Sequence, residues 1–341
     1  MSKILFANAH SLFDYTDGAS NSIRLMLEKL SLLGHEVFVV TGLISNGLDG
    51  FNYSKEFFKH DLNDEIKRFK KNGINFSLVK TKQWQRLQLS SIEQELIYRE
   101  TESIIKKNNI NLVIGWGNLL LEESILKEAK KKKINLCFYL VNPTYKGKKS
   151  YLLQNADLVI TDSVATRNLY KKDLNCEAMI LSKSLEKKPC QNFIKINSSI
   201  SKNCLLVNPS LEKGLEPLLK ISEYFYEQKS NLSFLCVDGR NQFKKKLNYL
   251  KFNEIDIKDN LSILTAVDDI DNLFSNIRVL LLLSIWHESG SRLILEAYAR
   301  GIPVIAFQTG GNSELMKNYP DDIFKKPDLF FDKNNQIRIR D

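Results

Sequence analysis

One stretch of the sequence concentrates side chains that could carry chemistry. Residues 280–314 read LLLLSIWHESGSRLILEAYARGIPVIAFQTGGNSE. An apolar run ending at Ile285 predicts a buried strand, and the polar turn after it holds Glu288. A helix should follow, with Ser289 or Ser291 as its N-cap. The free N–H groups of such a helix, at the carboxyl end of a sheet, favour an anion in the usual ligand crevice of α/β proteins.

The spacing within this predicted helix suggests a nucleotide site. Glu296 lies about 7–8 Å along the axis from Ser291, at ~1.5 Å per residue. A diphosphate at the helix start would leave a ribose near Glu296, whose carboxylate accepts hydrogen bonds from both hydroxyls of a diol. Glu288 would meet sugar hydroxyls beyond the phosphates. Two simpler interpretations stay open: Arg292 and Glu296, four apart, pair on the helix surface, or Glu288 is an exposed turn carboxylate.

The elements that position this segment alternate along the chain. At 341 residues, the length fits two domains of about 150 residues. Strand-length apolar runs alternate with helix-length periodic segments, which favours parallel sheets with crossover helices and hence an α/β fold. The predicted strands are Lys3–Ala7, Glu36–Thr41, Phe76–Val79, Leu112–Gly115, Asn135–Val141, Leu158–Thr161, Cys204–Val207, Ser233–Val237, Leu261–Leu264, Val279–Ile285 and Val304–Phe307.

The predicted helices lie between these strands. They are Ser20–Leu33, Ser91–Lys107, Leu120–Lys132, Tyr151–Asn155, one ending at Tyr170, Leu215–Tyr226, Gln242–Phe252, Ile270–Asn276 and Arg292–Ala299. The alternation weakens in a Lys-, Ser- and Asn-rich stretch that contains Pro189. We therefore expect a Rossmann-like domain at 1–182, a linker at 183–201, a second Rossmann-like domain at 202–318 and a C-terminal tail at 319–341, with a cleft between the two domains.

Two nucleotide fingerprints are missing from the expected places. A dinucleotide dehydrogenase would carry Gly-x-Gly-x-x-Gly after the first strand of a domain. The chain instead reads Asn-Ala-His-Ser-Leu after Ala7 and Asn-Pro-Ser after Val207, and it has no Gly-Lys-Ser/Thr phosphate loop. Two Rossmann-like domains alone do not name a function.

Composition adds limits on partners and location. The net charge is +9, which suits either a solvated basic face or contact with anionic membrane lipids. No Arg-and-aromatic nucleic-acid module is visible. The five cysteines have no metal-ligand spacing, the N-terminus does not resemble a signal peptide, and no apolar run reaches the ~18 residues of a membrane span. We expect a cytoplasmic protein, with peripheral contact at the inner membrane face left open.

Taken together, the motifs resemble the retaining family-4 (group 1) glycosyltransferases of the GT-B fold. Their hallmark is two glutamates separated by seven residues, then a Gly-x-Pro-Val strand and a Gly-Gly-x-x-Glu turn. The corresponding residues are Glu288 and Glu296, residues 301–304 and residues 310–314. Val207–Gly214 is similar to the family's phosphate loop, and Val237-Asp238-Gly239 to its next strand end. In the first half, Asp17-Gly18-Ala19, Gly34–Val37 and the segment from Asn155 to Ser163 look like family motifs.

The resemblance implies a role for each matching residue. Glu296 would bind the nucleotide ribose, Glu288 the donor-sugar hydroxyls, and Lys213 the diphosphate, with Arg292 as a second cation. Gly18 would line the cleft opposite the phosphates. The remaining donor-binding positions would be Ser289, Gly290, Ser291, Gly311, Glu314, Asn208 and Asn142.

Four departures from the family pattern bear on the donor, the rate and the closing of the cleft. Glu288-Ser289-Gly290-Ser291 replaces the common Glu-Gly-Phe-Gly, Asn208 stands where the family usually has arginine, and Asn142 where it often has histidine. The family's long C-terminal helix is replaced by a polar, proline-containing tail. Because Asn208 carries no charge, we predict that Arg292 supplies the missing cation.

The predicted activity is retaining sugar transfer from a nucleoside-diphosphate sugar to an unidentified glycan, lipid or small-molecule acceptor. In a front-face reaction the leaving phosphate takes the acceptor's proton, so no cofactor, metal ion or protein base is expected. Alternatives are a UDP-sugar epimerase or a phosphorylase of similar fold, and a non-catalytic sugar-nucleotide-binding protein. The acceptor would lie in the first domain near Tyr15, Trp116 and Tyr145, although these side chains could equally be packing residues.

Overall fold

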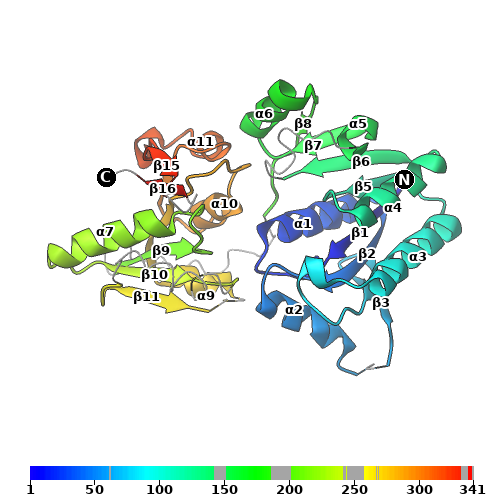
Figure 1. The fold of residues 1–341 in the computed structure, drawn as a ribbon, viewed down its shortest axis with the longest axis horizontal. Coiled ribbons are helices and arrows are strands. Elements are labelled where there is room, and N and C mark those ends of the chain that lie inside the picture. Colours follow the sequence, from blue (N-terminus) through cyan, green and yellow to red (C-terminus); the bar gives the residue numbers. More distant parts are fainter. Residues whose placement is uncertain are drawn as a thin grey trace. The chain divides into compact units, whose positions relative to one another are not determined.

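The chain divides into two compact units, unit 1 (Met1–Glu186) and unit 2 (Lys187–Asp341), in a computed structural model. The structure describes residues 1–60, 63–141, 151–185, 201–240, 243, 257–265, 267, 269–331 and 337–339. Each unit is an α/β layer structure with its own sheet (Figure 1). The predicted helix Gln242–Phe252, apart from Phe243, lies outside the described residues, as do Asn142, Tyr145 and most of the predicted linker.

Unit 1 is built on a sheet whose strands run in the order β3-β4-β2-β1-β5-β6-β7-β8. All neighbours pair in parallel except β3 and β4, which form an antiparallel hairpin at the edge. The strands are β1 (Lys3–His10), β2 (Glu36–Ile44), β3 (Ile66–Lys71), β4 (Ile74–Val79), β5 (Leu112–Gly115), β6 (Asn135–Leu140), β7 (Leu158–Thr161) and β8 (Met179–Ile180).

Helices cover both faces of this sheet. They are α1 (Gly18–Leu32), α2 (Leu48–Lys55), α3 (Ser91–Asn108), α4 (Leu120–Lys131), α5 (Tyr151–Asn155) and α6 (Val164–Leu174), with short 3-10 turns η1 (Glu56–Phe58) and η2 (Arg86–Gln88). Their starts carry side-chain caps where the sequence offers them. The Asp17 carboxylate accepts from the Ser20 N–H at 2.8 Å, and Ser90 and Glu93 form a capping box for α3.

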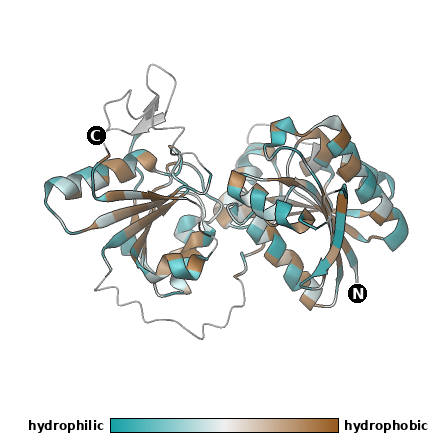
Figure 2. Ribbon diagram, turned by 90° about the horizontal axis from the view of Figure 1, so that it is seen from below, coloured by the Kyte–Doolittle hydropathy of each residue, from teal (hydrophilic) through white to brown (hydrophobic). Residues whose placement is uncertain are grey.

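The two-residue period of the strands separates two apolar cores. On β1, Leu5 and Ala7 face the layer of α3 and α4, whereas Ile4 and Phe6 face the layer of α1 and α2. Many strands are coloured hydrophobic in Figure 2, whereas the helices carry both hydrophobic and hydrophilic residues. Strands buried on both sides read as continuous apolar runs. This explains why the runs were recognisable in the sequence.

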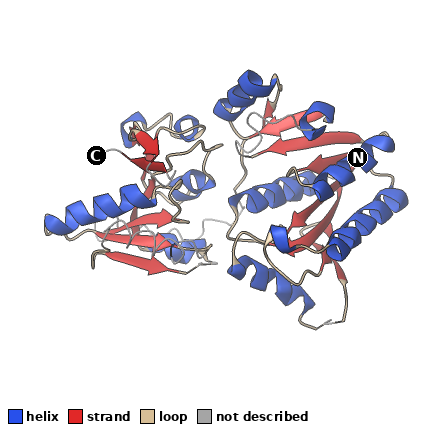
Figure 3. Ribbon diagram, viewed as in Figure 1, coloured by secondary structure: helices blue, strands red, loops and turns tan. Residues whose placement is uncertain are grey.

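Unit 2 repeats the plan with a smaller sheet, in the order β11-β10-β9-β12-β13-β14, all parallel (Figure 3). The strands are β9 (Asn203–Val207), β10 (Ser233–Val237), β11 (Leu261–Leu264), β12 (Ile277–Leu282), β13 (Val304–Phe307) and β14 (Ile323–Phe324). The described helices are α7 (Leu215–Glu227), α9 (Ile270–Ser275), α10 (Arg292–Tyr298), α11 (Asn312–Leu315) and the 3-10 turn η3 (Pro320–Asp322).

Several elements differ from the sequence-based expectation. Strand β3 and helix α2 were not predicted, because the lysines of the edge strand IKRFKK and the short, Gly-containing helix carry weak periodic signals. Strand β12 ends at Leu282 rather than at the predicted Ile285, so a longer apolar segment belongs to the following loop. Strand β14 adds the segment 323–324, predicted as tail, to the edge of the sheet, and β15 (Leu329–Phe331) pairs with β16 (Ile337–Ile339) as a hairpin.

Each sheet has one place where the strand order reverses direction. In unit 1 the chain runs from β1 outward through β2 and β4, and then returns to place β5 on the other side of β1. In unit 2 the same reversal lies between β9 and β12. Loops leave the carboxyl ends of both strands there in opposite directions, and ligands of open α/β sheets bind at this switch point.

The start of the predicted linker is held by a buried ion pair in unit 1. The Lys183 ammonium lies 2.8 Å from the Asp162 carboxylate, and the Tyr139 hydroxyl donates to the other oxygen of Asp162. The side chains of Asp162 and Lys183 are only 1% and 10% exposed. The carboxyl end of β7 and the segment after β8 are therefore fastened together.

None of the helices in the described part of the chain is long and apolar enough to span a bilayer.

Candidate functional site

Two loops at the switch point of unit 2 carry the predicted donor residues. The first, residues 208–214, joins β9 to α7 and is folded back on itself: the N–H groups of Lys213 and Leu215 donate to the Ser210 carbonyl at 3.1 and 3.0 Å. Gly214 closes it with φ +92°, and a Cβ there would lie 2.2 Å from the Leu283 carbonyl oxygen. Only glycine allows this loop to sit so close to the end of β12.

The second loop, residues 283–291, joins β12 to α10 and brings Glu288 against the first. The Ile285 N–H donates to the Glu212 carbonyl at 3.0 Å, which ties the two loops together. The Lys213 ammonium contacts Glu288 Oε1, and the Ser284 hydroxyl donates to the same oxygen at 2.7 Å. The Lys213 side chain is 36% exposed and that of Glu288 12%. Two residues 75 positions apart thus form one partly solvated ion pair.

The Gly-Gly turn after β13 holds the backbone of Glu288. The Gly311 N–H donates to the Glu288 carbonyl at 2.8 Å. Gly310 has φ +53°, and a Cβ there would lie 2.0 Å from the same carbonyl oxygen. Both glycines therefore support the backbone from which the Glu288 carboxylate projects.

Helix α10 starts where the sequence places it, after one of the two predicted N-cap serines, but the predicted side-chain cap does not form. Ser291 is the N-cap, and its side chain makes no capping hydrogen bond. Its own N–H instead donates to the Asn312 side-chain oxygen at 2.9 Å, and Asn312 is buried, 1% exposed. Asn312 thus fixes the start of α10 from the other side of the Gly-Gly turn.

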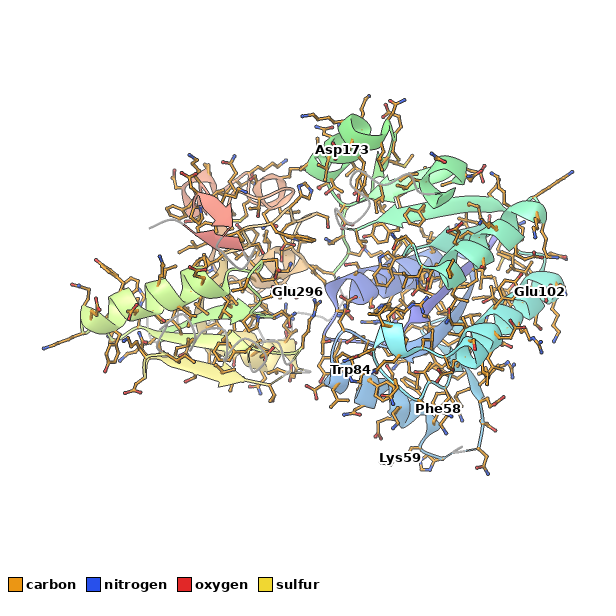
Figure 4. The ribbon with its side chains drawn as sticks, in the orientation of Figure 1. Phe58, Lys59, Trp84, Glu102, Asp173 and Glu296 are labelled. Carbon is orange, nitrogen blue, oxygen red and sulfur yellow. The ribbon has the colours of Figure 1, made fainter. Side chains whose placement is uncertain are left out.

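Arg292 and Glu296 form the second ion pair of the site. Arg292 Nε lies 2.5 Å from Glu296 Oε1, one turn later on α10, which carries the labelled Glu296 in Figure 4. Their side chains are 11% and 14% exposed, so this is not the exposed surface pair considered from the sequence. The guanidinium predicted to bind phosphate and the carboxylate predicted to bind ribose are therefore paired with each other in this structure.

The other predicted residues have these places. Ser289 and Gly290 are buried in the 283–291 loop, Gly290 with φ +107°, and Glu314 lies in α11. Asn208 opens the 208–214 loop with φ +57°, and its buried Oδ1 has no hydrogen-bond partner in the described residues. Gly18 is the exposed first residue of α1 in unit 1.

Sequence reasoning missed Ser284 and Asn312 in this site. Ser284 was read as part of a buried strand, and its hydroxyl gained meaning only when β12 proved to end at Leu282. Asn312 stands inside the Gly-Gly-x-x-Glu turn already singled out. Its signal would have been a buried amide opposite a helix start that lacks its own cap.

Unit 1 carries two buried carboxylates just before Gly18. Asp14 accepts from the Thr16 N–H at 3.0 Å and the Asn46 N–H at 2.7 Å, while Asp17 accepts from the Asn46 side chain at 2.7 Å. Burial, and secondly the charge of Asp17, raise the pKa of Asp14 to about 6. The carboxylates of Asp14 and Asp17 therefore hold the β1–α1 loop by accepting hydrogen bonds. Among the described residues, no cation forms an ion pair with Asp14.

The two aromatic candidates of unit 1 that fall within the described residues are both half-buried. Tyr15 packs edge-on against Tyr53, with ring centroids 5.7 Å apart. Trp116 lies beside His10, with ring centroids 5.3 Å apart. The third candidate, Tyr145, lies outside the described residues.

Part of the chain, including the two loops described above, matches a known protein-family model. Residues 206–334 match the model for "Glycosyl transferases group 1". This segment contains both loops, the Gly-Gly turn and all four residues of the two ion pairs. No curated protein sequence matches the chain.

Solved structures resemble the chain over nearly its whole length. A glycosyltransferase from Rickettsia africae is 16% identical, with 92% of this chain and 80% of that chain covered and a TM-score of 0.58. Anabaena HepE in complex with UDP-glucose is 15% identical, with 92% and 82% covered and a TM-score of 0.59. The catalytic domain of Arabidopsis thaliana starch synthase IV, bound to ADP and acarbose, is 12% identical, with 98% and 87% covered and a TM-score of 0.59.

These similarities show the fold. The chain has the α/β architecture of the GT-B glycosyltransferases, with a predominantly parallel sheet in each of two units.

Proposed function

We propose that the protein is a retaining glycosyltransferase that moves a sugar from a nucleoside-diphosphate sugar to an acceptor hydroxyl. The observation that carries the proposal is the Lys213–Glu288 contact at the switch point of unit 2, inside the segment that matches the family model. A cation and a carboxylate are held there at the end of the sheet where ligands of such folds bind. The lysine ammonium suits a phosphate, and the glutamate carboxylate suits sugar hydroxyls.

In this proposal the donor replaces one partner of each ion pair. The diphosphate takes the Lys213 ammonium, and Glu288, still held by the Ser284 hydroxyl at 2.7 Å, turns its acceptor capacity to the hydroxyls of the donor sugar. The ribose diol engages Glu296, which frees Arg292 for a phosphate oxygen. The 36% exposure of Lys213 keeps the cost of this exchange low, because the pair is already partly solvated.

The residues then act on the leaving group. As the bond between the anomeric carbon and the β-phosphate oxygen breaks, negative charge grows on the diphosphate. The acceptor oxygen forms its bond to the anomeric carbon on the same face, and its proton passes to the leaving phosphate. Preorganised donors at such a charge are worth roughly 3–4 kcal/mol of barrier each. Lys213 and Arg292 would supply this stabilisation, and no metal ion is needed, so chelation with EDTA should leave turnover unchanged.

The proposed donor is best tested with a panel, because neither the base nor the sugar is fixed by the residues. HepE is described with UDP-glucose and starch synthase IV with ADP, so the panel contains uridine, adenosine, guanosine and thymidine diphosphates and their sugars. A ligand at ~100 times its dissociation constant raises the unfolding free energy by about 2.7 kcal/mol, which thermal shift detects.

Turnover separates the proposal from its alternatives. A transferase releases nucleoside diphosphate when an acceptor is added, an epimerase changes the sugar without releasing the nucleotide, and a binding protein shows affinity alone. NMR of the product linkage tests retention. An inverted anomeric centre would contradict the mechanism while leaving transfer intact.

A further inference from the structure

The edge of the unit 1 sheet at which its parallel strands begin gathers lysines from four separate elements. Helices α1, α3 and α4 end just before β2, β5 and β6, and the β3–β4 turn leads into β4. Because these strands are parallel, all four segments meet at the same edge, which the N-terminus of the chain marks in Figure 1. This amino edge lies opposite the switch-point loops of unit 1.

Printed contacts of the folded unit join these segments into one surface. The Asn72 side chain, in the β3–β4 turn, donates to the Glu28 carboxylate on α1 at 3.0 Å. The Lys3 N–H, at the start of β1, donates to the side chain of Asn111, which follows α3, at 2.7 Å. Helices α3 and α4 pack against each other. The lysines of the amino edge are therefore held next to one another by the fold of unit 1.

The amino edge carries an excess of positive charge. Its exposed lysines are Lys29, Lys70, Lys71, Lys106, Lys107, Lys131, Lys132 and Lys133. Within the described residues, only three of these eight form ion pairs, and they share two carboxylates, Glu102 and Glu128. Three further carboxylates at this edge, Glu28, Glu36 and Asp157, each pair with another cation. The surface therefore favours an anionic partner.

Two exposed leucines stand among these lysines. Leu32 ends α1 and Leu33 is its C-cap, and they are 79% and 76% exposed. Lys29 lies in the same last turn of the helix. The helix dipole favours a lysine there, but it accounts neither for the leucines nor for Lys70 and Lys71 of the β3–β4 hairpin. Cations combined with exposed aliphatic side chains are typical of a surface that lies on anionic lipid.

The chemistry of this surface favours a bilayer over nucleic acid. Its exposed cations are all lysines, whereas nucleic-acid recognition commonly uses the planar fork of arginine and the stacking of bases on aromatic rings. The exposed leucines would find no apolar partner on a phosphate backbone. In a bilayer they would enter the boundary between headgroups and acyl chains, where apolar side chains of peripheral proteins are buried.

We propose that the amino edge of unit 1 docks on an anionic membrane surface, with Leu32 and Leu33 entering the headgroup region and the exposed lysines contacting lipid phosphates. The proposal does not depend on the proposed transferase function. Strand β1 has 8 residues and spans roughly 25 Å from the amino to the carboxyl edge. Docking therefore leaves the switch-point loops of unit 1 well away from the lipid and open to water.

The first experiment measures binding of the full chain to vesicles by cosedimentation. Phosphatidylcholine vesicles are compared with phosphatidylcholine vesicles that contain phosphatidylglycerol, each at low and high salt. We expect binding to the anionic vesicles alone, and weaker binding at high salt because salt screens the lysines from the lipid charge. Equal binding to neutral vesicles, no binding to anionic vesicles, or tighter binding to a duplex oligonucleotide overturns the proposal.

The second experiment locates the lysines that bind. The test variant removes three exposed lysines from three elements of the amino edge: Lys29→Gln, Lys107→Gln and Lys133→Gln. The matched control removes the same charge from segments that follow the carboxyl ends of β2 and β4: Lys55→Gln, Lys59→Gln and Lys82→Gln. A lysine near an anionic surface contributes about 1 kcal/mol, which is about fivefold in affinity. The test variant should therefore bind anionic vesicles about 100-fold more weakly, and the control within about twofold of the wild type. Equal losses in the two variants would show that net charge alone acts, and would overturn the assignment to this edge.

The leucines are tested with a variant of unchanged charge. Leu32→Gln with Leu33→Gln should weaken binding to anionic vesicles at least about tenfold, because two apolar side chains no longer leave water. Leu87→Gln with Leu120→Gln is the matched control, since these leucines are 93% and 80% exposed beyond the carboxyl ends of β4 and β5, and it should change nothing. Unchanged vesicle binding in the Leu32/Leu33 variant overturns the proposal. A wild-type dimer, seen by light scattering and lost in this variant, would assign the leucines to a second copy of the chain and would also overturn it.

Discussion

The Lys213–Glu288 pair of unit 2 differs in exposure from two buried ion pairs of unit 1. In unit 2 the Lys213–Glu288 contact is partly open, with a lysine side chain that is 36% exposed. In unit 1 the pairs are closed: Arg86–Glu122 is 14% and 4% exposed, and Lys183–Asp162 is 10% and 1% exposed. A partly solvated pair loses little when one partner turns to a ligand, whereas a buried pair leaves an uncompensated charge when it is broken. We infer that the Lys213–Glu288 pair holds its charges for exchange and that the two unit 1 pairs hold theirs for architecture. The second pair of unit 2, Arg292–Glu296, is 11% and 14% exposed and thus closer to the unit 1 pairs.

The sharpest test of this difference compares two lysines. Lys183→Met leaves Asp162 buried without its cation and should cost about 3–5 kcal/mol of the unfolding free energy of unit 1. Lys213→Met removes a partly exposed partner and should cost less than about 1 kcal/mol. Chemical denaturation of both variants measures the two values. Equal losses would show that exposure does not distinguish the two regions.

A pH titration probes the buried acid of unit 1. The pKa of Asp14 is about 6 in the folded chain against an ordinary value of 3.8, so folding takes up a proton between these values. The free energy of unfolding therefore includes the full contribution of Asp14 below about pH 4. This contribution decreases as the pH rises to about 6, and above that pH the free energy of unfolding no longer depends on Asp14 titration. The loss is about 3 kcal/mol at ~1.4 kcal/mol per pH unit.

Asp14→Asn should remove this part of the pH dependence while keeping one acceptor oxygen for Thr16. Denaturation midpoints of the wild type and the variant from pH 4 to pH 7.5 give the difference curve. A difference that does not change between pH 4 and pH 6 would contradict the raised pKa. A substitution at Gly50 could not replace Asp14→Asn in this experiment, because a Cβ at Gly50 would lie 2.0 Å from Asp14 Oδ1 and would displace that side chain.

We expect removal of the partly exposed Lys213 ammonium to weaken nucleotide binding rather than to lower the stability of the fold. Lys213→Ala is expected to weaken nucleoside diphosphate binding by about 1.5–3 kcal/mol, the range of a hydrogen bond to a charged group, without loss of fold. The matched nucleoside, which lacks phosphates, should bind the variant and the wild type alike. Isothermal titration of both ligands decides this, and an equal loss for nucleoside and diphosphate would exclude Lys213 as a phosphate ligand.

Arg292 tests whether an ion pair in unit 2 is exchanged or permanent. Arg292→Leu should lower turnover roughly 100- to 1,000-fold if the guanidinium reaches the diphosphate, as expected for loss of one preorganised donor, and adding Asn208→Arg should restore part of it. The contact with Glu296 at 2.5 Å makes the permanent pair a real competitor. If the variant keeps its activity and only its melting temperature falls, Arg292 stabilises α10 through Glu296 and does not bind the diphosphate. Lys213 would then be the one cation of these two ion pairs that turns to the donor.

The two glutamates should differ in what they control, with the smallest expected effect in binding. Glu296→Gln keeps an acceptor oxygen and should weaken nucleotide binding by about 1 kcal/mol. Glu288→Gln should lower kcat with little change in nucleotide affinity. Titration with the nucleoside diphosphate and initial rates measure both. Unchanged affinity in the Glu296 variant would rule out the ribose contact.

Most of the described elements were predictable because their signals are local. Buried parallel strands such as Leu112–Gly115 and Leu158–Thr161 are continuous apolar runs, and helices such as α3 carry their caps in sequence. The candidate donor loop was recognised for the same reason, since Glu288, Glu296 and the Gly-Gly turn lie within a short stretch of chain. Strand β3 escaped because an edge strand rich in lysine has little apolar pattern.

The sequence by itself determined the strand–helix alternation and the α/β class. It also left open a short-range pair of Arg292 with Glu296, since four residues span about one helical turn, and the structure contains that pair. Tertiary structure alone decided that Lys213 meets Glu288, that Asn312 holds the start of α10 and that Arg86 lies on Glu122. Local periodicity states which face of a strand is buried. It does not state which strands are neighbours, and strand order is what brings loops distant in sequence to the same carboxyl edge.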